Sequence, residues 1–116
     1  MTERFDGHVV LVTGSATGIG EATALRFASE GAAVACLDVH VKENEATAEA
    51  VAALGVDALA LTCDVRSRAA QEQAFATVVE QWGRIDTLVT SAGIYVGGPL
   101  TEIPAERWDD IVAVNL

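Results

Sequence analysis

Four short apolar runs, each too brief for a helix, constrain the fold of this chain more than any other feature. The runs cover residues 8–13, 33–38, 58–63 and 85–90. Their aliphatic and β-branched content is typical of buried strands. The segments between and after them are predicted helices over residues 18–30, 42–54, 67–82 and 104–116. Since helical crossovers connect parallel strands, the alternation predicts an α/β fold with a doubly wound parallel sheet.

The predicted helices also have expected faces. In the first, the side chains expected on one apolar side are Ile19, Ala22 and Phe27. In the third, which Ser67 can cap, the apolar residues at i, i+3, i+4 and i+7 are Phe75, Val78, Val79 and Trp82. In the second, the residues expected to face solvent are Glu43, Glu45 and Glu49.

Composition narrows the class of partner. The 116 residues fit one domain, and 51 % hydrophobic residues fit a globular chain. A net charge of −10 repels nucleic acids and anionic lipid surfaces. No apolar run is long enough to span a bilayer, and residues 1–6 lack the pattern of a secretory leader. Cys36 and Cys63 are too far apart in the sequence to form a metal-ligand pair. We therefore expect a cytoplasmic protein with reduced cysteines and no metal, nucleic-acid or membrane partner.

A glycine-rich loop connects the first predicted strand directly to the first helix. Its sequence from Thr13 is TGSATGIG, which ends at Gly20. Three glycines allow a sharp turn and close approach of a ligand, and the helix start offers unpaired N–H groups and a positive dipole end. No lysine follows Gly20, so the loop is not a P-loop. We predict that it binds the pyrophosphate of a dinucleotide; the alternative is a glycine-rich turn without a ligand.

Asp38 ends the second predicted strand, about 20 residues beyond the glycine loop, where a carboxylate can accept hydrogen bonds from the adenosine ribose. The same charge repels the 2′-phosphate of NADP: two like unit charges at ~4 Å and an effective dielectric of ~20 cost about 4 kcal/mol. No Arg or Lys stands at positions 15, 16, 17 or 39 to offset this repulsion. The sequence therefore favours NAD over NADP. The alternative is an aspartate that only caps a loop.

Together these motifs resemble classical short-chain dehydrogenases. The Thr-Gly-x-x-x-Gly-x-Gly loop is similar to the cofactor loop of that family, Asp64-Val65 is similar to its adenine-holding pair, and the run 108–116 is similar to the helix that ends in its catalytic Asn, here Asn115. Thr90-Ser91-Ala92-Gly93 resembles its Asn-Asn-Ala-Gly motif. The resemblance implies cofactor contacts from Gly14, Ser15, Thr17, Gly18, Ile19, Gly20, Asp38, Val39, Asp64, Val65, Ser91, Ala92 and Gly93.

The sequence departs from the family pattern in two places. Thr90 and Ser91 replace both asparagines, which removes the amides that would connect that strand to its neighbours, although Ala92 and Gly93 still permit close approach to the ribose. The active Ser and the Tyr-x-x-x-Lys of the family would lie beyond residue 116. Tyr95 cannot replace that tyrosine, because a proline stands four residues later and Lys42 is the only lysine.

The resemblance implies a Rossmann-like sheet of about four strands in the order 3-2-1-4, one NAD-binding domain over residues 1–116 that stops before the Ser/Tyr/Lys segment. The fourth strand then becomes an edge whose Leu88 and Val89 face opposite sides, so we expect truncation or association with another chain, and a homo-oligomer. His8 and His40 are interpreted as loop histidines, and the cysteines as buried apolar groups.

The resemblance implies hydride transfer between NAD and a secondary alcohol or ketone in the complete protein. A noncatalytic NAD-binding module or an inactive fragment is the second hypothesis, because the Tyr-x-x-x-Lys motif is absent from the 116 residues. A methyltransferase is disfavoured, since its glycine loop is usually spaced differently and it does not explain residues 108–115.

Overall fold

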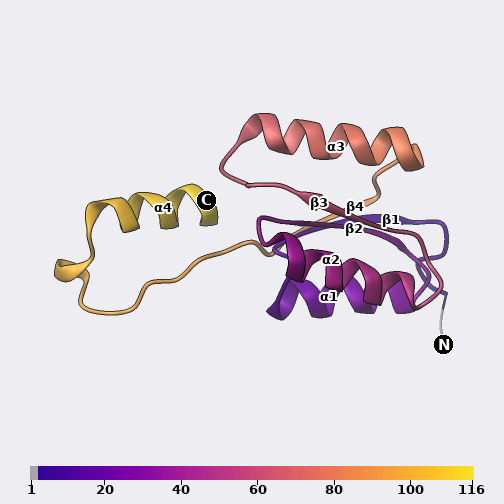
Figure 1. Ribbon diagram of the computed structural model, residues 1–116, viewed down its shortest axis with the longest axis horizontal. Helices are drawn as coiled ribbons and strands as arrows, with labels where there is room; N and C mark the ends of the chain where they lie inside the picture. The colour runs from indigo at the N-terminus through magenta and orange to yellow at the C-terminus, as the bar shows by residue number, and fades with distance from the viewer. Residues whose placement is uncertain (1–2) are drawn as a thin grey trace.

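The computed structural model describes residues 3–116. Residues 1 and 2 of the 1–6 stretch, which is predicted not to be a secretory leader, lie outside the described residues. The four strands are β1 (Val9–Thr13), β2 (Ala33–Asp38), β3 (Ala58–Thr62) and β4 (Thr87–Thr90). They form one parallel sheet in the order β3-β2-β1-β4 (Figure 1). This is the predicted doubly wound order. The strands added from β1 to β3 extend the sheet to one side of β1, whereas β4 is added on the other side.

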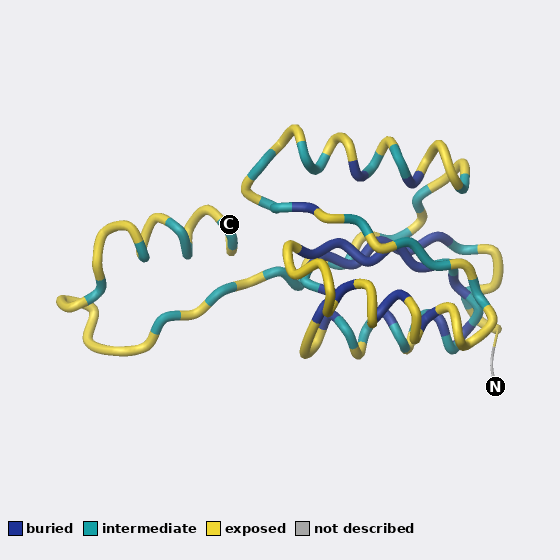
Figure 2. Tube along the Cα trace, viewed as in Figure 1, coloured by how far each residue is buried: buried dark blue, intermediate teal, exposed yellow. Residues whose placement is uncertain are grey.

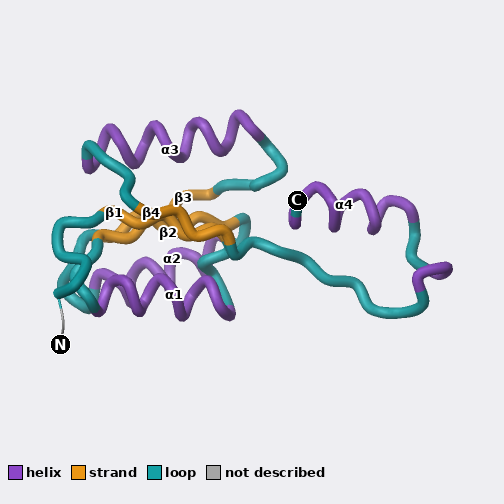
Figure 3. Tube along the Cα trace, turned by 180° about the vertical axis from the view of Figure 1, so that it is seen from behind, coloured by secondary structure: helices purple, strands orange, loops and turns teal. Residues whose placement is uncertain are grey.

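Helices cover both faces of the sheet. The helical elements are α1 (Gly18–Ser29), α2 (Val41–Ala52), α3 (Arg68–Trp82), the 3₁₀ turn η1 (Leu100–Glu102) and α4 (Ala105–Asn115). Helices α1 and α2 lie on one face and α3 on the other (Figures 1 and 3). The predicted start signals are confirmed: Ser67 accepts a hydrogen bond from the amide of Ala70 at 3.1 Å, and Pro104 is the N-cap residue of α4.

The core has two layers because side chains alternate along the central strands. Val10, Val12 and Val34 face α1 and α2, whereas Leu11 and Leu37 face α3. Every residue of β1 is buried, as expected for a central strand covered on both faces (Figure 2). Both cysteines are buried and free, and burial raises the pKa of the Cys36 thiol to about 11, as expected of inert apolar side chains.

The expected apolar face of α1 is confirmed for Phe27, which is partly buried against the core, and is wrong for Ile19 and Ala22. The residues that this helix buries are Gly20, Ala24 and Ala28, while Ile19 is 80 % exposed and Ala22 is exposed. Small residues at i, i+4 and i+8 allow α1 to pack closely on the sheet. In α3, Val79 likewise lies outside the buried face. The three glutamates expected to face solvent on α2 are exposed.

Strand β4 is shorter than predicted and forms one edge of the sheet. Before it, the amide of Asp86 donates to the Val9 carbonyl at 2.9 Å, and the Asp86 carboxylate accepts from the Val9 amide at 2.8 Å. The Asp86 side chain therefore provides the acceptor that a backbone carbonyl would provide in a regular pairing of β1 with β4. Leu88, in the middle of β4, is 47 % exposed.

Helix α4 stands away from the sheet, at the end of the extended segment that follows β4 (Figures 1 and 3). None of its residues is buried (Figure 2). Over residues 3–116, no helix combines the length and apolar character that a bilayer crossing requires, and no cluster of three potential metal ligands is found.

Candidate dinucleotide-binding site

A cavity of about 490 Å³ opens where the strands end at their carboxyl side. This is the edge at which open α/β sheets bind ligands, beside the point where the strand order reverses. Its lining brings together twelve of the thirteen residues predicted to contact a cofactor. They are Gly14, Thr17, Gly18, Ile19, Gly20, Asp38, Val39, Asp64, Val65, Ser91, Ala92 and Gly93.

Two glycines of the loop are required by close packing. A Cβ added to Gly20 would lie 2.0 Å from the carbonyl oxygen of Gly14, and one added to Gly14 would lie 2.7 Å from Cα of Ala92. Gly14 also has φ of +68°. The turn after β1, the start of α1 and the end of β4 therefore meet at backbone distance, and that contact forms the floor of the cavity.

The N-terminus of α1 offers hydrogen-bond donors to the cavity. Its N-cap residue Thr17 makes no side-chain capping bond. The amide of Glu21 donates to the Thr17 carbonyl at 3.3 Å, so the amides of Gly18, Ile19 and Gly20 precede that bond. Unpaired amides at a positive dipole end are the chemistry that binds a phosphate.

Ser15 is the one predicted contact residue outside the cavity lining. It is fully buried, and its hydroxyl donates to the side-chain oxygen of Asn44 at 2.6 Å. Its side chain therefore points into the protein. Ser15 lies in the turn, as the sequence predicts. The position of a residue in a turn does not by itself determine whether its side chain faces a ligand or the protein interior.

Asp38 lies at the cavity, and its carboxylate is 9 % exposed. One oxygen accepts from the Ala16 amide at 3.0 Å, and the other accepts from the His40 amide at 2.9 Å and lies 2.9 Å from His40 Nδ1. Burial opposes ionisation, but these hydrogen bonds and the nearby imidazole outweigh it and keep the pKa of Asp38 below its usual value. A charged acceptor thus stands beside the glycine turn.

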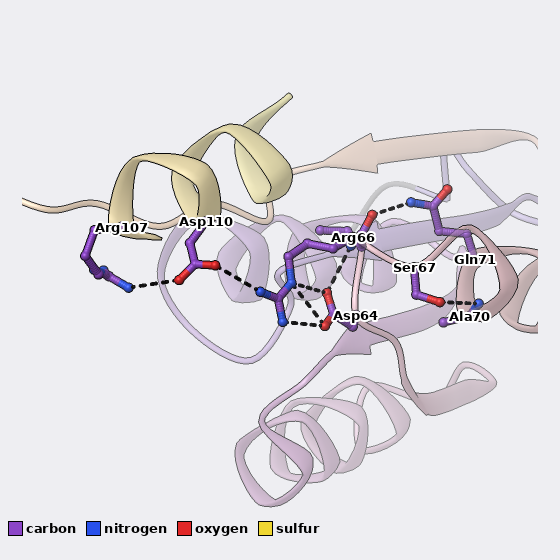
Figure 4. Close-up of polar contacts among 8 residues, drawn as sticks. Asp64, Arg66, Ser67, Ala70, Gln71, Arg107 and Asp110 are labelled. Carbon is purple, nitrogen blue, oxygen red and sulfur yellow. Dashed lines mark hydrogen bonds and ion pairs between the residues drawn. The ribbon is translucent and has the colours of Figure 1, made fainter. Parts of the chain in front are cut away.

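Asp64 and Val65 follow β3, as predicted. Arg66, the next residue, forms ion pairs with Asp64 and with Asp110 of α4 (Figure 4). Its guanidinium contacts both oxygens of Asp64, at 2.9 Å from Nη2 to Oδ2, and reaches Asp110 of α4 at 3.3 Å. Arg107 lies 3.7 Å from the same Asp110. Hydrogen bonds from the Arg66 side chain and amide lower the pKa of Asp64. This ion-pair group connects α4 to the end of β3.

Ser91 connects β4 to β1 through its hydroxyl, so such a contact does not require the amide of the family asparagine. Its hydroxyl donates to the Thr13 carbonyl at 2.7 Å. The amides of Ser91 and Ala92 both donate to the Thr13 hydroxyl at 3.2 Å. A serine hydroxyl is long enough here because the two strand ends lie at backbone distance.

Asn115 does not line the main cavity but borders it through Ile94 and lines a smaller one of about 350 Å³. Its side-chain Oδ1 accepts from the backbone N–H of Ile94 at 2.9 Å, and its side-chain Nδ2 donates to the backbone carbonyl of Ile94 at 3.0 Å. The side chain therefore holds the segment after β4 against the end of α4. Tyr95 is 85 % exposed.

Sequence reasoning missed five residues of the cavity lining: His40, Cys63, Arg66, Ile94 and Val114. His40, Arg66 and Ile94 directly follow predicted motifs, so proximity in sequence could have indicated them. Val114 comes from α4, whose approach depends on tertiary contacts. The predicted loop role of His40 holds, but its contact with Asp38 was not foreseen.

The strand order, the glycine turn and the strand-end carboxylate define a Rossmann-like fold. Residues 8–116 match the family model described as short chain dehydrogenase. The chain therefore belongs to the short-chain dehydrogenase family. That family binds a nicotinamide cofactor, and the glycine turn, helix N-terminus and Asp38 provide the donors and acceptor that such a group needs.

Two relatives that the chain resembles over almost its whole length are named dehydrogenases. Sorbitol dehydrogenase of Cereibacter sphaeroides is 39 % identical over 113 residues, and D-threitol dehydrogenase of Mycolicibacterium smegmatis is 42 % identical over 116. Each alignment covers 97 % of this chain but only 43 % and 44 % of the relative. A solved structure of NAD⁺-bound xylitol dehydrogenase superposes with a TM-score of 0.92 at 38 % identity, covering 97 % of this chain and 44 % of that one. The chain thus spans under half the length of these relatives.

Proposed function

We propose that this chain forms the NAD-binding part of an oxidoreductase that transfers hydride between NAD and a secondary alcohol or ketone. The observation that carries the proposal is the ionised Asp38 beside the glycine turn. A bound nicotinamide dinucleotide supplies the hydride acceptor or donor. The residues of the chain bind and orient it: the α1 amides meet the pyrophosphate, and Asp38 accepts hydrogen bonds from the adenosine ribose.

The proposed cofactor contacts extend along the cavity from Asp38. Asp64 and Val65 would face the adenine, while Ser91, Ala92 and Gly93 would lie along the ribose near the end of β4. Ser15 would act through its place in the turn, because its side chain is buried. These roles are the ones that the family resemblance implies for residues that line the cavity.

We propose a preference for NAD over NADP. The 2′-phosphate would approach the Asp38 carboxylate, and the repulsion of two like charges at ~4 Å is of the order of 4 kcal/mol at an effective dielectric of ~20. The structure adds one cation to the cavity, Arg66, but Asp64 and Asp110 already pair with it. His40 contacts the Asp38 carboxylate itself.

The proposed substrates are small alcohols or ketones, in keeping with the sorbitol, threitol and xylitol dehydrogenases to which the chain is similar. In the complete protein, Asn115 would take the role of the family asparagine, which holds a water in a proton relay. For the 116 residues alone, we propose NAD binding without turnover. Tyr95 is an exposed phenol, and the chain's only lysine, Lys42, is in α2, so the 116 residues contain no Tyr-x-x-x-Lys pair for general acid–base work.

We propose a cytoplasmic homo-oligomer. The free, buried cysteines favour a reducing compartment, and the exposed Leu88 on the edge strand β4 favours contact with a further protein surface.

Calorimetric titration of the chain with NAD and with NADP tests the proposal. We expect NAD to bind at least tenfold more tightly, which corresponds to about 1.4 kcal/mol. Alcohol oxidation by the same sample separates the enzyme from the noncatalytic module. Equal affinity for both dinucleotides would refute the NAD preference, and no binding by folded protein would refute the function.

A further inference from the structure

A buried polar group lies behind the glycine turn, on the side away from the cavity. Asn44, in the first turn of α2, is 2 % exposed and does not line the cavity. Its side-chain N–H groups donate to the Cys36 carbonyl at 2.8 Å and to the Leu61 carbonyl at 3.4 Å. Its side-chain oxygen accepts from the Ser15 hydroxyl at 2.6 Å. One amide thus contacts β2, β3 and the turn.

The two strand carbonyls determine how this amide is oriented. Carbonyl oxygens only accept, so the NH₂ group must face Cys36 and Leu61, and the amide oxygen is left for Ser15. A reversed amide would place its oxygen against two carbonyl oxygens. The Ser15 hydroxyl has a single proton and two acceptors within reach, Asn44 Oδ1 at 2.6 Å and the Leu37 carbonyl at 3.3 Å. The much shorter contact assigns the proton to Asn44. Every polar atom of the group is therefore satisfied without water.

This contact is the turn's connection to α2. The amides of Gly14 and Ser15 donate to the Leu37 carbonyl at 2.9 and 3.4 Å, and the Ala16 amide donates to Asp38, so all these bonds reach only the end of β2. The Ser15–Asn44 bond adds a second element, and Asn44 carries the connection on to β3. These hydrogen bonds to β2 and α2 add to the close packing of Gly14 against Ala92 and Gly20.

We propose that Asn44 is a positioning residue of the dinucleotide site, which acts through Ser15 to fix the turn from Gly14 to Thr17. The turn sets where the α1 amides lie relative to Asp38, so loosening it separates the phosphate and ribose contacts. The inference rests on the proposed function for the identity of the ligand. The contacts themselves are present in the chain without a ligand.

Thr47 provides a matched control. It is 1 % exposed, lies on the same buried side of α2, and its hydroxyl donates to the Glu43 carbonyl within the helix at 3.2 Å. Like Asn44, it is a buried polar residue whose replacement lowers stability, but its hydrogen bond does not reach the turn. Thr47→Val and Asn44→Leu thus separate loss of stability from loss of positioning.

The first test is amide hydrogen exchange of the chain without cofactor. In Asn44→Leu we expect the amides of residues 14–17 to exchange about tenfold faster relative to those of residues 10–12 in β1, since a lost hydrogen bond near 1.4 kcal/mol opens the turn by that factor. Thr47→Val should change both sets equally. An unchanged ratio in Asn44→Leu would overturn the inference.

The second test is NAD affinity in the same variants. We expect Asn44→Leu to weaken NAD binding about tenfold, Thr47→Val to leave it unchanged, and Ser15→Ala with Asn44→Leu to be no weaker than Asn44→Leu alone, because both act through one contact. Equal losses in Asn44→Leu and Thr47→Val, or additive losses in the double variant, would overturn it. If Asn44→Leu fails to fold, Ser15→Ala against Thr47→Val decides both tests. Wild-type chain with a protected turn but no NAD binding would refute the proposed function alone.

Discussion

The carboxylate of Asp38 and the amide of Ala16, 22 residues apart in the chain, are joined by a hydrogen bond of 3.0 Å. This bond fixes the end of β2 against the glycine turn, so the acceptor expected for a ribose and the loop expected for a pyrophosphate form one unit. It also makes Asp38 both a structural residue and a candidate ligand-binding residue, and the two roles can be separated by experiment.

Replacing Asp38 with Asn should change cofactor preference. Asparagine keeps an oxygen for the Ala16 amide but removes the charge that strengthens hydrogen bonds from ribose hydroxyls. We expect NAD affinity to fall about tenfold, near 1.4 kcal/mol, and the NAD-to-NADP affinity ratio to fall further as repulsion is lost. Calorimetry with both dinucleotides measures this. Asp109→Asn, an exposed change of equal charge on α4, should leave the ratio unaltered; an unaltered ratio in Asp38→Asn contradicts the prediction.

Stability should fall on acidification partly through Asp38. Hydrogen bonds to its carboxylate outweigh the effect of burial and hold its folded-state pKa below the usual value. Its contribution is therefore complete above the unfolded-state pKa of about 3.9 and is lost as the pH falls through the lower folded-state value. Urea unfolding from pH 6 to pH 3 should show a larger loss for wild type than for Asp38→Asn. Parallel curves would show that this carboxylate is not the cause.

Replacing Gly20 with Ala should destabilise the fold, although alanine is the better helix former. The added Cβ would lie 2.0 Å from the Gly14 carbonyl oxygen and 2.5 Å from the Ser91 hydroxyl, and the first of these is backbone. Overpacking of this kind costs about 1–3 kcal/mol, and a contact with fixed backbone belongs near the upper end, above the gain of about 1 kcal/mol in helix propensity. Chemical denaturation measures the difference. Gly97→Ala meets only the flexible Tyr95 side chain and should be tolerated; equal stability of both variants argues against the close contact.

The chain by itself should associate through the β4 edge. Leu88 is 47 % exposed in the edge strand, where an unpaired backbone and an apolar side chain favour contact with another surface. We expect binding of a hydrophobic dye and a concentration-dependent increase in size on gel filtration, both reduced in Leu88→Lys. Leu54→Lys, at 46 % exposure after α2, is the matched control and should reduce neither. A monomeric wild type that binds no dye would contradict this.

Local sequence patterns predicted the elements of this fold and most of the candidate site. Apolar runs located each strand within two residues. The signal is strongest for the central strands β1 and β2, because a strand covered on both faces must be apolar throughout. The glycine loop located the turn, because only glycine allows backbone contact between Gly14, Gly20 and Ala92. The helix faces were less well predicted: α1 packs through Gly20, Ala24 and Ala28, and small residues carry little signal in a hydrophobic pattern.

By itself the sequence determined where the strands lie in the chain, the glycine turn after β1 and the position of an acidic residue at the end of β2, because each depends on neighbours in the chain. The strand order was expected from the family resemblance, since the pairing of β1 with β4 joins residues far apart in sequence. Only the tertiary structure decided that Ser15 faces Asn44, that Ser91 bonds to Thr13, and that Arg66 joins Asp64 to Asp110. Such contacts depend on the distance and direction between elements far apart in sequence. Those are set by packing of the whole sheet and its helices, which no local pattern of residues specifies.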